Sequence, residues 1–227
     1  MNRLAEQDEC DRAIAGAVGS EAMVGAIFAR SKPRRFTKGE VLFHSGDRGD
    51  ALHFVGSGRV ALRTGRTDGA LTIVRVAGPG QTIGDHLLSN ATDTHPFSAV
   101  ALDVVWTRAI RKHDIDQLVR QHPRCMFEIS SRALSDWLTP AMRLGDSHWD
   151  RADRRVLKAV LYFASKYANG PSVTIPVTHD IIASFAGVNR STATMAILDA
   201  QINGHLSVRR GTITIADLAA FSAWVAQ

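Results

Sequence analysis

The sequence is poor in cysteine. Cys10 and Cys125 are the only two in 227 residues, which is too few for a disulfide framework and for the four thiolate ligands of an iron–sulfur cluster. No apolar run approaches the roughly 20 residues of a membrane-spanning helix, and the N-terminus lacks the apolar core of a signal peptide. We therefore expect a cytoplasmic protein without an iron–sulfur cluster and without a membrane partner.

Motifs of several enzyme classes are also missing. The sequence contains no Gly-rich phosphate loop of the Walker type, no HExxH motif and no GxSxG motif. Its 45% hydrophobic and 22% charged residues are those of an ordinary globular protein. We expect a chain that is not an enzyme, and a length of 227 residues favours two domains.

The charge balance suits a polyanionic partner. The formal net charge is +5 and the sequence pI is near 9.7. A mildly basic solvated surface is common, so charge alone does not identify the partner.

The stretch from Val177 to Leu206 predicts two helices joined by a tight turn. Thr178 suits the N-cap of the first helix, Gly187 lies where the chain must reverse, and Asn189 suits the N-cap of the second. The expected inward residues are Ile181, Ile182 and Phe185 in the first helix and Ala193, Ala196, Ile197 and Ala200 in the second. Such a pair is a helix-turn-helix, whose second helix enters the DNA major groove.

A short basic hairpin is predicted next, in Leu206 to Ile215, with Arg209, Arg210 and Gly211 at its tip. A basic tip beside a recognition helix suits phosphate contacts, which orient a protein on DNA. The candidate DNA-binding residues are Thr178, His179, Asn189, Arg190, Ser191, Thr192, Thr194, Arg209 and Arg210, with Arg190, Ser191 and Thr194 as base readers. The helix pair alone also suits a buried hairpin of an unrelated helical domain.

Short β-rich runs alternate with glycine turns between Arg35 and Arg111. The runs cover residues 40–44, 51–55, 59–63, 71–76, 99–102 and 104–110, and turn signals such as Gly46-Asp47 and Gly56-Ser57-Gly58 separate them. Many short strands with frequent glycine turns predict a small antiparallel barrel or jelly roll. Residues 1–30 predict one or two short helices ahead of it.

Several segments of this region carry a resemblance. Gly39-Glu40-Val41-Leu42-Phe43, Gly46-Asp47, Leu52-His53-Phe54-Val55, Gly58-Arg59-Val60 and Gly80-Gln81-Thr82-Ile83-Gly84 are similar to the β-roll of cyclic-nucleotide-binding domains. With the C-terminal helix-turn-helix, the chain resembles the cyclic-AMP receptor protein/FNR (Crp/Fnr) family of bacterial transcription regulators from about Arg35 to Ile215.

The resemblance implies an α+β fold in three parts. These are N-terminal helices with a cyclic-nucleotide-binding-like β-roll (jelly roll) in residues 1–111, a long dimerisation helix in residues 112–147, and a winged helix-turn-helix in residues 148–227. It also implies a homodimer that binds a two-fold DNA operator, responds to an effector or binds constitutively, and works with RNA polymerase. The alternative is a regulator that binds a cyclic nucleotide or another small ligand and acts through protein contacts alone.

The family's nucleotide pocket is altered in this chain. Its ribose-binding Gly-Glu pair corresponds to Gly84-Asp85, its phosphate-binding Arg-Ser pair to His95-Pro96, and its base-binding Thr-Ser pair to Pro140-Ala141. Histidine and proline do not reproduce the paired charge-assisted hydrogen bonds of an arginine, which argues against cyclic AMP. Gly84, Asp85 and His95 remain candidates for binding another anionic ligand, although an isolated Asp and His near a loop also suit solvent-facing positions.

Haem is a further cofactor to consider, because it needs an axial histidine. His44, His53, His86, His95 and His113 lie in or beside the expected sensor domain, and no spacing singles one out. We expect no other metal site.

A helical pattern runs from Lys112 to about Gly145. Its apolar positions suit a contact between the two helices of a dimer, and they are Phe127, Ser130, Leu134, Trp137, Ala141 and Leu144. The same residues suit a single helix that covers the β-roll. Pro140 predicts a kink or break, because it removes a backbone donor and crowds the carbonyl of Asp136. Residues 145–150 are the expected hinge.

Overall fold

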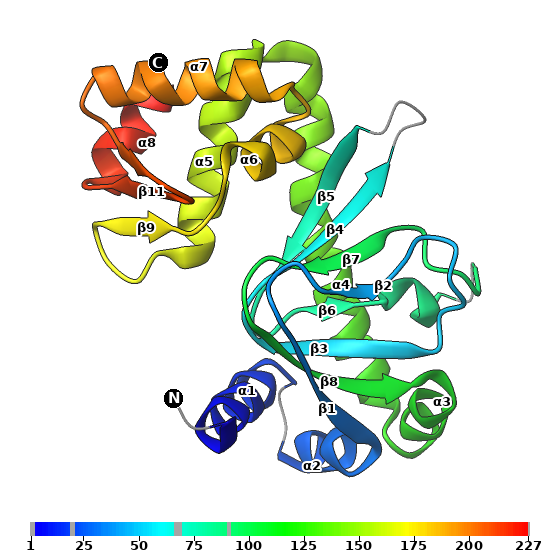
Figure 1. The fold of residues 1–227 in the computed structure, drawn as a ribbon. Helices are drawn as coiled ribbons and strands as arrows, with labels where there is room; N and C mark the ends of the chain where they lie inside the picture. The colour runs from blue at the N-terminus through cyan, green and yellow to red at the C-terminus, as the bar shows by residue number, and fades with distance from the viewer. Residues whose placement is uncertain (1–2, 19–20, 66–69, 90–91, 227) are drawn as a thin grey trace. The chain divides into compact units, whose positions relative to one another are not determined.

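The chain divides into two units in the computed structural model, which describes residues 3–18, 21–65, 70–89 and 92–226 (Figure 1). Unit 1 comprises Met1–Thr64 and Val74–Pro140, and unit 2 comprises Gly65–Ile73 and Ala141–Gln227. Unit 1 contains the predicted β-roll and unit 2 the predicted helix-turn-helix. The predicted α+β fold class is thereby confirmed.

Two sheets form the β-roll, with strand orders β1-β8-β3-β6 and β2-β7-β4-β5. The pairs β1–β8, β3–β8, β2–β7 and β4–β7 are antiparallel, as expected for a jelly roll. The strands are β1 Ser31–Phe36, β2 Val41–Phe43, β3 Ala51–Ser57, β4 Val60–Gly65, β5 Leu71–Ala77, β6 Thr82–Ile83, β7 Ser98–Ala101 and β8 Val105–Arg111, and a 3₁₀ helix, η1, covers Asp85–Leu88.

The sequence pattern missed β1 and β6. Strand β1 pairs with β8 from Ser31 opposite Ile110 to Phe36 opposite Val105. Its four middle residues are exposed, and they include Pro33 and three cationic side chains. An edge strand tolerates both proline and charge, because one of its sides has no partner strand and its face here is solvated. A pattern based on apolar alternation therefore does not detect it.

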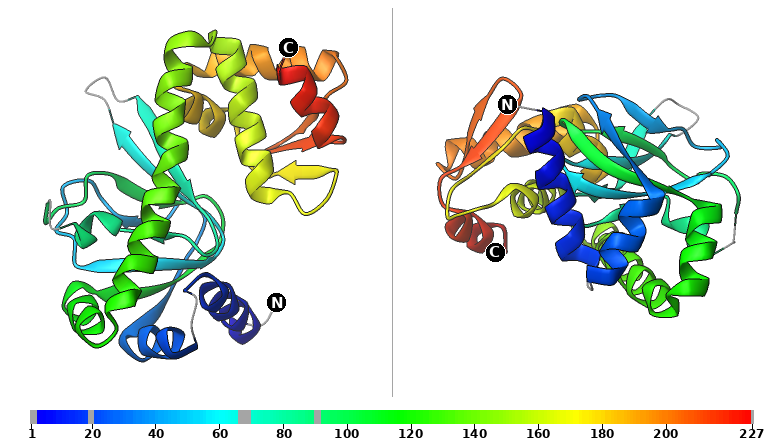
Figure 2. Two further views of the ribbon diagram at one scale, coloured as in Figure 1. Left: turned by 180° about the vertical axis from the view of Figure 1, so that it is seen from behind. Right: turned by 90° about the horizontal axis from the view of Figure 1, so that it is seen from below.

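Side chains of the strands enter two separate cores. Leu52 and Phe54 of β3 lie in the outer core with Trp106 and Ile110 of β8. Helices α1 (Arg3–Val18), α2 (Glu21–Arg30) and α3 (Lys112–Gln121) cover that core, and Figures 1 and 2 show them along the same side of the roll. Val55 and its partners fill the inner core between the sheets, made of Val55, Val60, Leu62, Ala77, Ile83, Ala99, Ala101 and Val105. Each fully buried large side chain contributes about 1.5–3 kcal/mol.

Helix α4 is unbroken from Pro123 to Trp149. Of the predicted kink or break at Pro140, the break is wrong, because a proline removes only one hydrogen bond and the turns on either side keep theirs, whereas the kink stays a prediction. The boundary between the two units falls after Pro140, within this helix. The predicted hinge at residues 145–150 is also wrong in extent, since α4 continues to Trp149 and α5 (Ala152–Tyr167) begins three residues later.

Unit 2 contains α5 and the predicted winged helix-turn-helix. Its further elements are β9 Val173–Ile175, α6 His179–Ala186, α7 Arg190–Ile202, β10 Ser207–Arg209, β11 Thr212–Ile215 and α8 Leu218–Ala226. The strands form one sheet in the order β10-β11-β9. Val156, Phe163, Ile182, Ile197 and Phe221 are among its buried residues, so α5, α6, α7 and α8 all contribute to one core. No single helix in the described ranges is long and apolar enough to cross a membrane.

Candidate nucleic-acid interface and effector pocket

Helices α6 and α7 form the helix-turn-helix, and their axes differ by 109°. The Thr178 hydroxyl accepts a hydrogen bond from the amide of Ile181 and caps α6. Gly187 ends α6 with φ 66° and ψ 39°, a left-handed conformation in which glycine lacks the penalty of a side chain. Local signals in the sequence thus set both the start of α6 and the turn after it.

Asn189 caps the recognition helix α7. Its side-chain oxygen accepts hydrogen bonds from the amide of Thr192 at 2.8 Å and from the hydroxyl of Ser191 at 2.7 Å. The predicted inward residues of α7 are confirmed as buried, and they are Ala193, Ala196, Ile197 and Ala200. In α6, Ile182 and Phe185 are buried as predicted, whereas Ile181 is only half-buried.

The first turn of α7 presents polar side chains to solvent. Arg190 is 71% exposed, and its guanidinium lies 3.4 Å from the carboxylate of Asp180. Ser191 is also exposed. Thr194 is half-buried, and its hydroxyl lies 3.1 Å from Nδ1 of His179. Of the three predicted base readers, Arg190 and Ser191 are therefore the most accessible.

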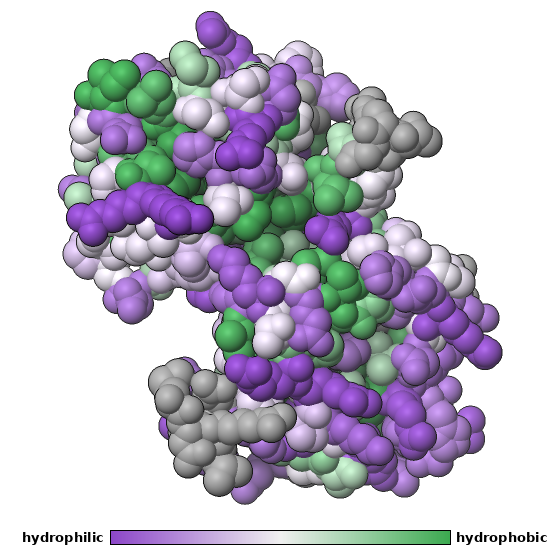
Figure 3. All heavy atoms as spheres, viewed as in Figure 1, coloured by the Kyte–Doolittle hydropathy of each residue, from purple (hydrophilic) through white to green (hydrophobic). Residues whose placement is uncertain are grey.

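The hairpin β10–β11 carries the remaining basic candidates. Arg209 and Arg210 are exposed, and Gly211 has φ 76° in the turn. Strand β11 pairs on its other side with β9, which ties the hairpin to the helix-turn-helix domain. In Figure 3 hydrophilic side chains cover this hairpin. The geometry is that of a wing.

Arg155 of α5 supports the turn, a role that the sequence did not indicate. Its Nε donates to the carbonyl of Ala186 at 3.2 Å, and its Nη1 donates to the carbonyl of Asp150 at 3.2 Å. Carbonyls in the last turn of a helix have no intrahelical partner, so this arginine satisfies one of them for α6. No local signal marks an arginine for such a contact 31 residues along the chain.

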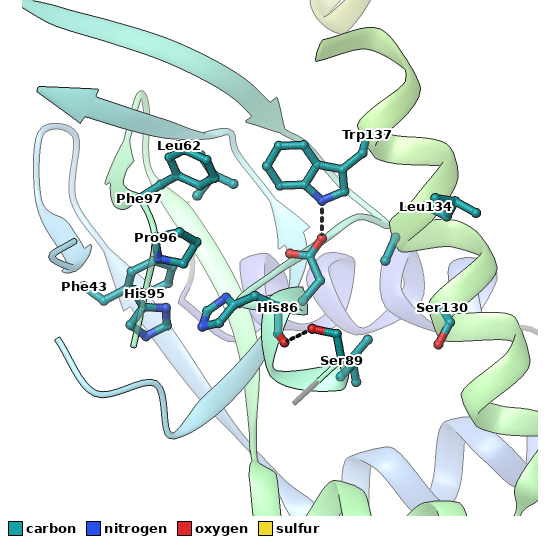
Figure 4. Close-up of a pocket in the computed structure, with 14 residues that line it drawn as sticks. Phe43, Leu62, His86, Ser89, His95, Pro96, Phe97, Ser130, Leu134 and Trp137 are labelled. Atoms are coloured by element: carbon teal, nitrogen blue, oxygen red, sulfur yellow. Dashed lines mark hydrogen bonds between the residues drawn. The ribbon is translucent and has the colours of Figure 1, made fainter. Parts of the chain in front are cut away.

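A pocket of about 400 Å³ lies in unit 1. It brings together all three predicted pocket residues, Gly84, Asp85 and His95, with side chains from α4 (Figure 4). Its lining consists of Phe43, Leu62, Gly84, Asp85, His86, Leu88, Ser89, His95, Pro96, Phe97, Ser130, Ala133, Leu134 and Trp137. Gly84 is required there, because it has φ 83° and a Cβ atom would lie 2.8 Å from the carbonyl oxygen of Ala51.

Asp85 is buried in a charged cluster beside the pocket. Its Oδ2 accepts hydrogen bonds from Arg75 at 2.9 Å and from the indole Nε1 of Trp137 at 2.8 Å. Arg75, with a side chain only 1% exposed, also donates to the carbonyl of Thr82 at 2.7 Å and pairs with Asp136 of α4 at 3.0 Å. A buried guanidinium needs such partners, because desolvation of an unpaired charge is costly.

His95 is buried beside aromatic rings. Its imidazole stacks on Phe43 with ring centroids 3.6 Å apart, and His86 meets it edge-on at 4.9 Å. Burial is the main cause that lowers the pKa values of both His86 and His95, and the neighbouring His86 lowers that of His95 further. Both imidazoles are therefore uncharged at neutral pH. The solvent-facing alternative for Asp85 and His95 is wrong.

Comparison with known proteins agrees with this geometry. Residues 33–122 match the family model of the cyclic nucleotide-binding domain. The chain is 25% identical over 205 residues to the CRP-like cAMP-activated global transcriptional regulator of Mycobacterium tuberculosis, covering 86% of this chain and 88% of that protein. It is 24% identical over 186 residues to the cyclic AMP receptor protein of Thermus thermophilus, covering 82% and 84%.

The chain thus contains a cyclic nucleotide-binding domain and is similar over most of its length to CRP-like transcription regulators. The relatives that span most of its length are regulators and not enzymes, in agreement with the missing catalytic motifs.

Solved structures share the fold. The c-di-GMP responsive global regulator CLP of Xanthomonas campestris matches with a TM-score of 0.76 at 18% identity, covering 86% of this chain and 99% of that one. FixK2 of Bradyrhizobium japonicum matches with a TM-score of 0.74 at 14% identity, covering 85% and 96%. At these identities the likeness concerns the fold alone.

The pocket does not fit a cyclic nucleotide in the manner that the Crp/Fnr resemblance implies. Among the described residues that line it, none is a lysine or an arginine. His95 and Pro96, which the resemblance assigns to the phosphate-binding positions, line the pocket, while Pro140 and Ala141 are outside the lining. A cyclic phosphate that entered the pocket would lose its hydrating water. Because no free cation is among the described residues that line the pocket, no charge–charge contact would offset that desolvation cost.

Three other histidines are candidates for haem binding. His44 and His113 are exposed, and His53 is half-buried in β3. Within the described part of the chain, no group of three or more His, Cys, Asp or Glu side chains is placed to hold a metal ion.

Helix α4 presents one side to the roll and another to solvent. Trp137 lines the pocket, as do Ser130 and Leu134, and its place in a dimer seam stays a prediction. Phe127 is 76% and Leu134 71% exposed, and Leu138, which is not among the predicted seam residues, is 58% exposed. Ala141 and Leu144 are exposed as well. Leu138 follows Phe127 by eleven residues and Leu134 by four, which keeps all three on one face.

His53 makes the stability of unit 1 depend on pH. Burial lowers its pKa to about 4 from an ordinary value of 6.5, and Nδ1 lies 3.2 Å from the hydroxyl of Thr107. The unfolded chain binds a proton below about pH 6.5 whereas the folded one does not, so stability falls as the pH drops from about 6.5 to about 4. We expect His53 to account for a loss of about 2 kcal/mol between pH 7 and pH 5.

Urea unfolding followed by circular dichroism measures this loss. The control is His53→Asn, which keeps a polar group near Thr107 but does not titrate. An equal loss in both proteins would show that His53 is not the source.

Proposed function

We propose that the protein is a cytoplasmic, homodimeric transcription factor that binds a two-fold DNA operator, with RNA polymerase as its partner at the promoter. The capped, exposed start of α7 carries this proposal, because Arg190 and Ser191 project from the end of the helix that enters a major groove. The exposed Arg209 and Arg210 of the wing suit phosphate contacts.

The exposed apolar face of α4 supports the homodimer. Phe127, Leu134 and Leu138 lie on one face of α4 and are exposed to water, and association of two copies would bury them. In the dimer, the two recognition helices have to enter successive major grooves on one face of the DNA, which are about 34 Å apart. An effector in the pocket would act by favouring one arrangement of the two α4 helices over another.

Fluorescence anisotropy with duplexes from upstream of its own gene tests the proposal. Selective binding over scrambled DNA, weakened by salt, is the expected result. Adding cyclic AMP should leave the affinity unchanged, because the pocket lacks the family's phosphate contacts. Binding without sequence preference in every condition, with effectors and salt varied, would contradict the proposal.

Arg190→Ala should cost about 1–3 kcal/mol of binding free energy and relax the preference at one base pair per half-site. The reason is that a guanidinium at this position can form two hydrogen bonds with a guanine edge. The measurement is anisotropy on a set of operators with single base changes.

The matched control is Arg210→Ala on the wing. It should weaken binding by a similar amount on every operator. It should also reduce the slope of log affinity against log salt concentration by about one, because one phosphate contact is lost. If Arg190→Ala behaves in the same uniform way, Arg190 contacts phosphate and does not read a base.

A second candidate function is regulation through protein contact without DNA. Met195, Leu198 and Ile202 favour it, because these apolar side chains of α7 are exposed. Figure 3 shows hydrophobic surface at one end of α7. Such residues suit contact with a protein partner better than contact with phosphates. The same anisotropy experiment separates the two functions.

A further inference from the structure

The charge around the pocket disfavours an anionic ligand. One arginine, Arg75, faces two aspartates, Asp85 and Asp136, which leaves an excess of one negative charge. The guanidinium is already bonded to both carboxylates and to the carbonyl of Thr82, and it does not line the pocket. A phosphate or carboxylate entering the pocket would therefore meet Asp85 without a free cation to balance it.

The walls of the pocket are rich in flat rings. Phe43 stacks on His95, and Phe97 lies 5.8 Å from Trp137, centroid to centroid. Figure 4 shows Trp137 on α4 across the pocket from Phe43, His95 and Phe97. Ring faces and edges favour a planar aromatic ligand, since offset-stacked and edge-to-face contacts add to the burial of apolar area.

Two ring nitrogens in the pocket wall, Nε2 of His86 and Nδ1 of His95, have no hydrogen-bond partner among the described residues. Nδ1 of His95 is fully buried, and no described residue forms a hydrogen bond with it. His95 is 4% exposed as a residue, so its unpartnered nitrogen costs free energy unless a ligand or a water bonds to it. A neutral imidazole can accept or donate one hydrogen bond at this atom.

We infer that the pocket binds an uncharged, planar aromatic molecule that carries a hydroxyl or a similar hydrogen-bonding group, in place of a cyclic nucleotide. The rings of Phe43, Phe97 and Trp137 hold its aromatic body. His95 bonds to its polar group, and the carboxylate of Asp85 favours a ligand that donates a hydrogen bond.

This ligand class also connects the pocket to the dimer helix. Trp137 contacts the pocket and donates to Asp85, and Leu138, the next residue of α4, is exposed on the dimer face. A ligand that moves Trp137 would move the same turn of helix. This consequence rests on the proposed dimeric regulator, whereas binding itself does not.

The test is isothermal titration calorimetry of the full chain at neutral pH, without DNA. The probe is 2-naphthol, an uncharged aromatic alcohol, and the comparison ligands are 2-naphthoate, which has the same rings with a negative charge, and cyclic AMP. We expect 2-naphthol to bind at least about tenfold more tightly than either anion, because the buried carboxylate repels them. Absence of 2-naphthol binding, or tighter binding of either anion, would overturn the inference. Because DNA is absent, failure of the operator assay would not affect this result.

Two variants locate the bound probe. Ala133→Phe places a ring into the pocket from α4 and should abolish 2-naphthol binding, while Thr139→Phe on an exposed part of the same helix should not change it. His95→Phe keeps an aromatic ring against Phe43 but removes the nitrogen, and should weaken binding at least about fivefold through the lost hydrogen bond. Circular dichroism shows whether each variant folds. Unchanged binding in both pocket variants would place the probe elsewhere and refute the assignment.

Discussion

Replacing Arg75 with methionine should lower the free energy of unfolding of unit 1 by about 3–5 kcal/mol. Arg75 is 2% exposed and holds two carboxylates, so its removal leaves Asp85 buried with the Trp137 indole as its one remaining partner among the described residues. Methionine fills a similar volume, which confines the effect mainly to charge and hydrogen bonding. Urea unfolding at neutral pH, followed by fluorescence, measures the change.

The double variant Arg75→Met with Asp85→Asn is the control for this effect. It removes the unpaired charge along with its partner and should recover more than half of the lost stability, because a buried ion pair is itself worth little relative to neutral groups. If the double variant is as unstable as the single one, the loss comes from packing and not from the stranded carboxylate.

Replacing Phe127 and Leu138 together with glutamate should weaken binding to a two-fold operator by about 100-fold or more. Each monomer would then bind one half-site alone and would lose the extra affinity that two linked subunits gain by binding both half-sites together. Four carboxylates on facing helices oppose association, and both wild-type side chains are exposed and outside the pocket lining, so the fold of the monomer should persist.

Sedimentation gives the oligomeric state, and anisotropy on full and half operators gives the affinities. The control is Thr139→Glu, which is exposed about 100° around α4 from Leu138 and should leave both unchanged. A monomeric variant that binds the full operator as tightly as the wild type would contradict the proposed dimer.

Local chemistry made the helix-turn-helix predictable. The caps at Thr178 and Asn189 and the left-handed Gly187 act within three or four residues, so their geometry is readable from neighbours in the chain. The glycine turns of the β-roll are similar. The resemblance to the Crp/Fnr family then placed Gly84, Asp85 and His95 at a pocket before any geometry was known.

Contacts between distant residues were not readable in this way. The run LTIVRVA shows that Arg75 interrupts an apolar strand, and a buried charge needs partners, but Asp85 and Asp136 are 10 and 61 residues away. The side of α4 that faces the roll decides that Trp137 lines the pocket and Leu138 is exposed, although the helical pattern suits either choice. Helical spacing defines a face, and only packing against the β-roll decides what that face contacts.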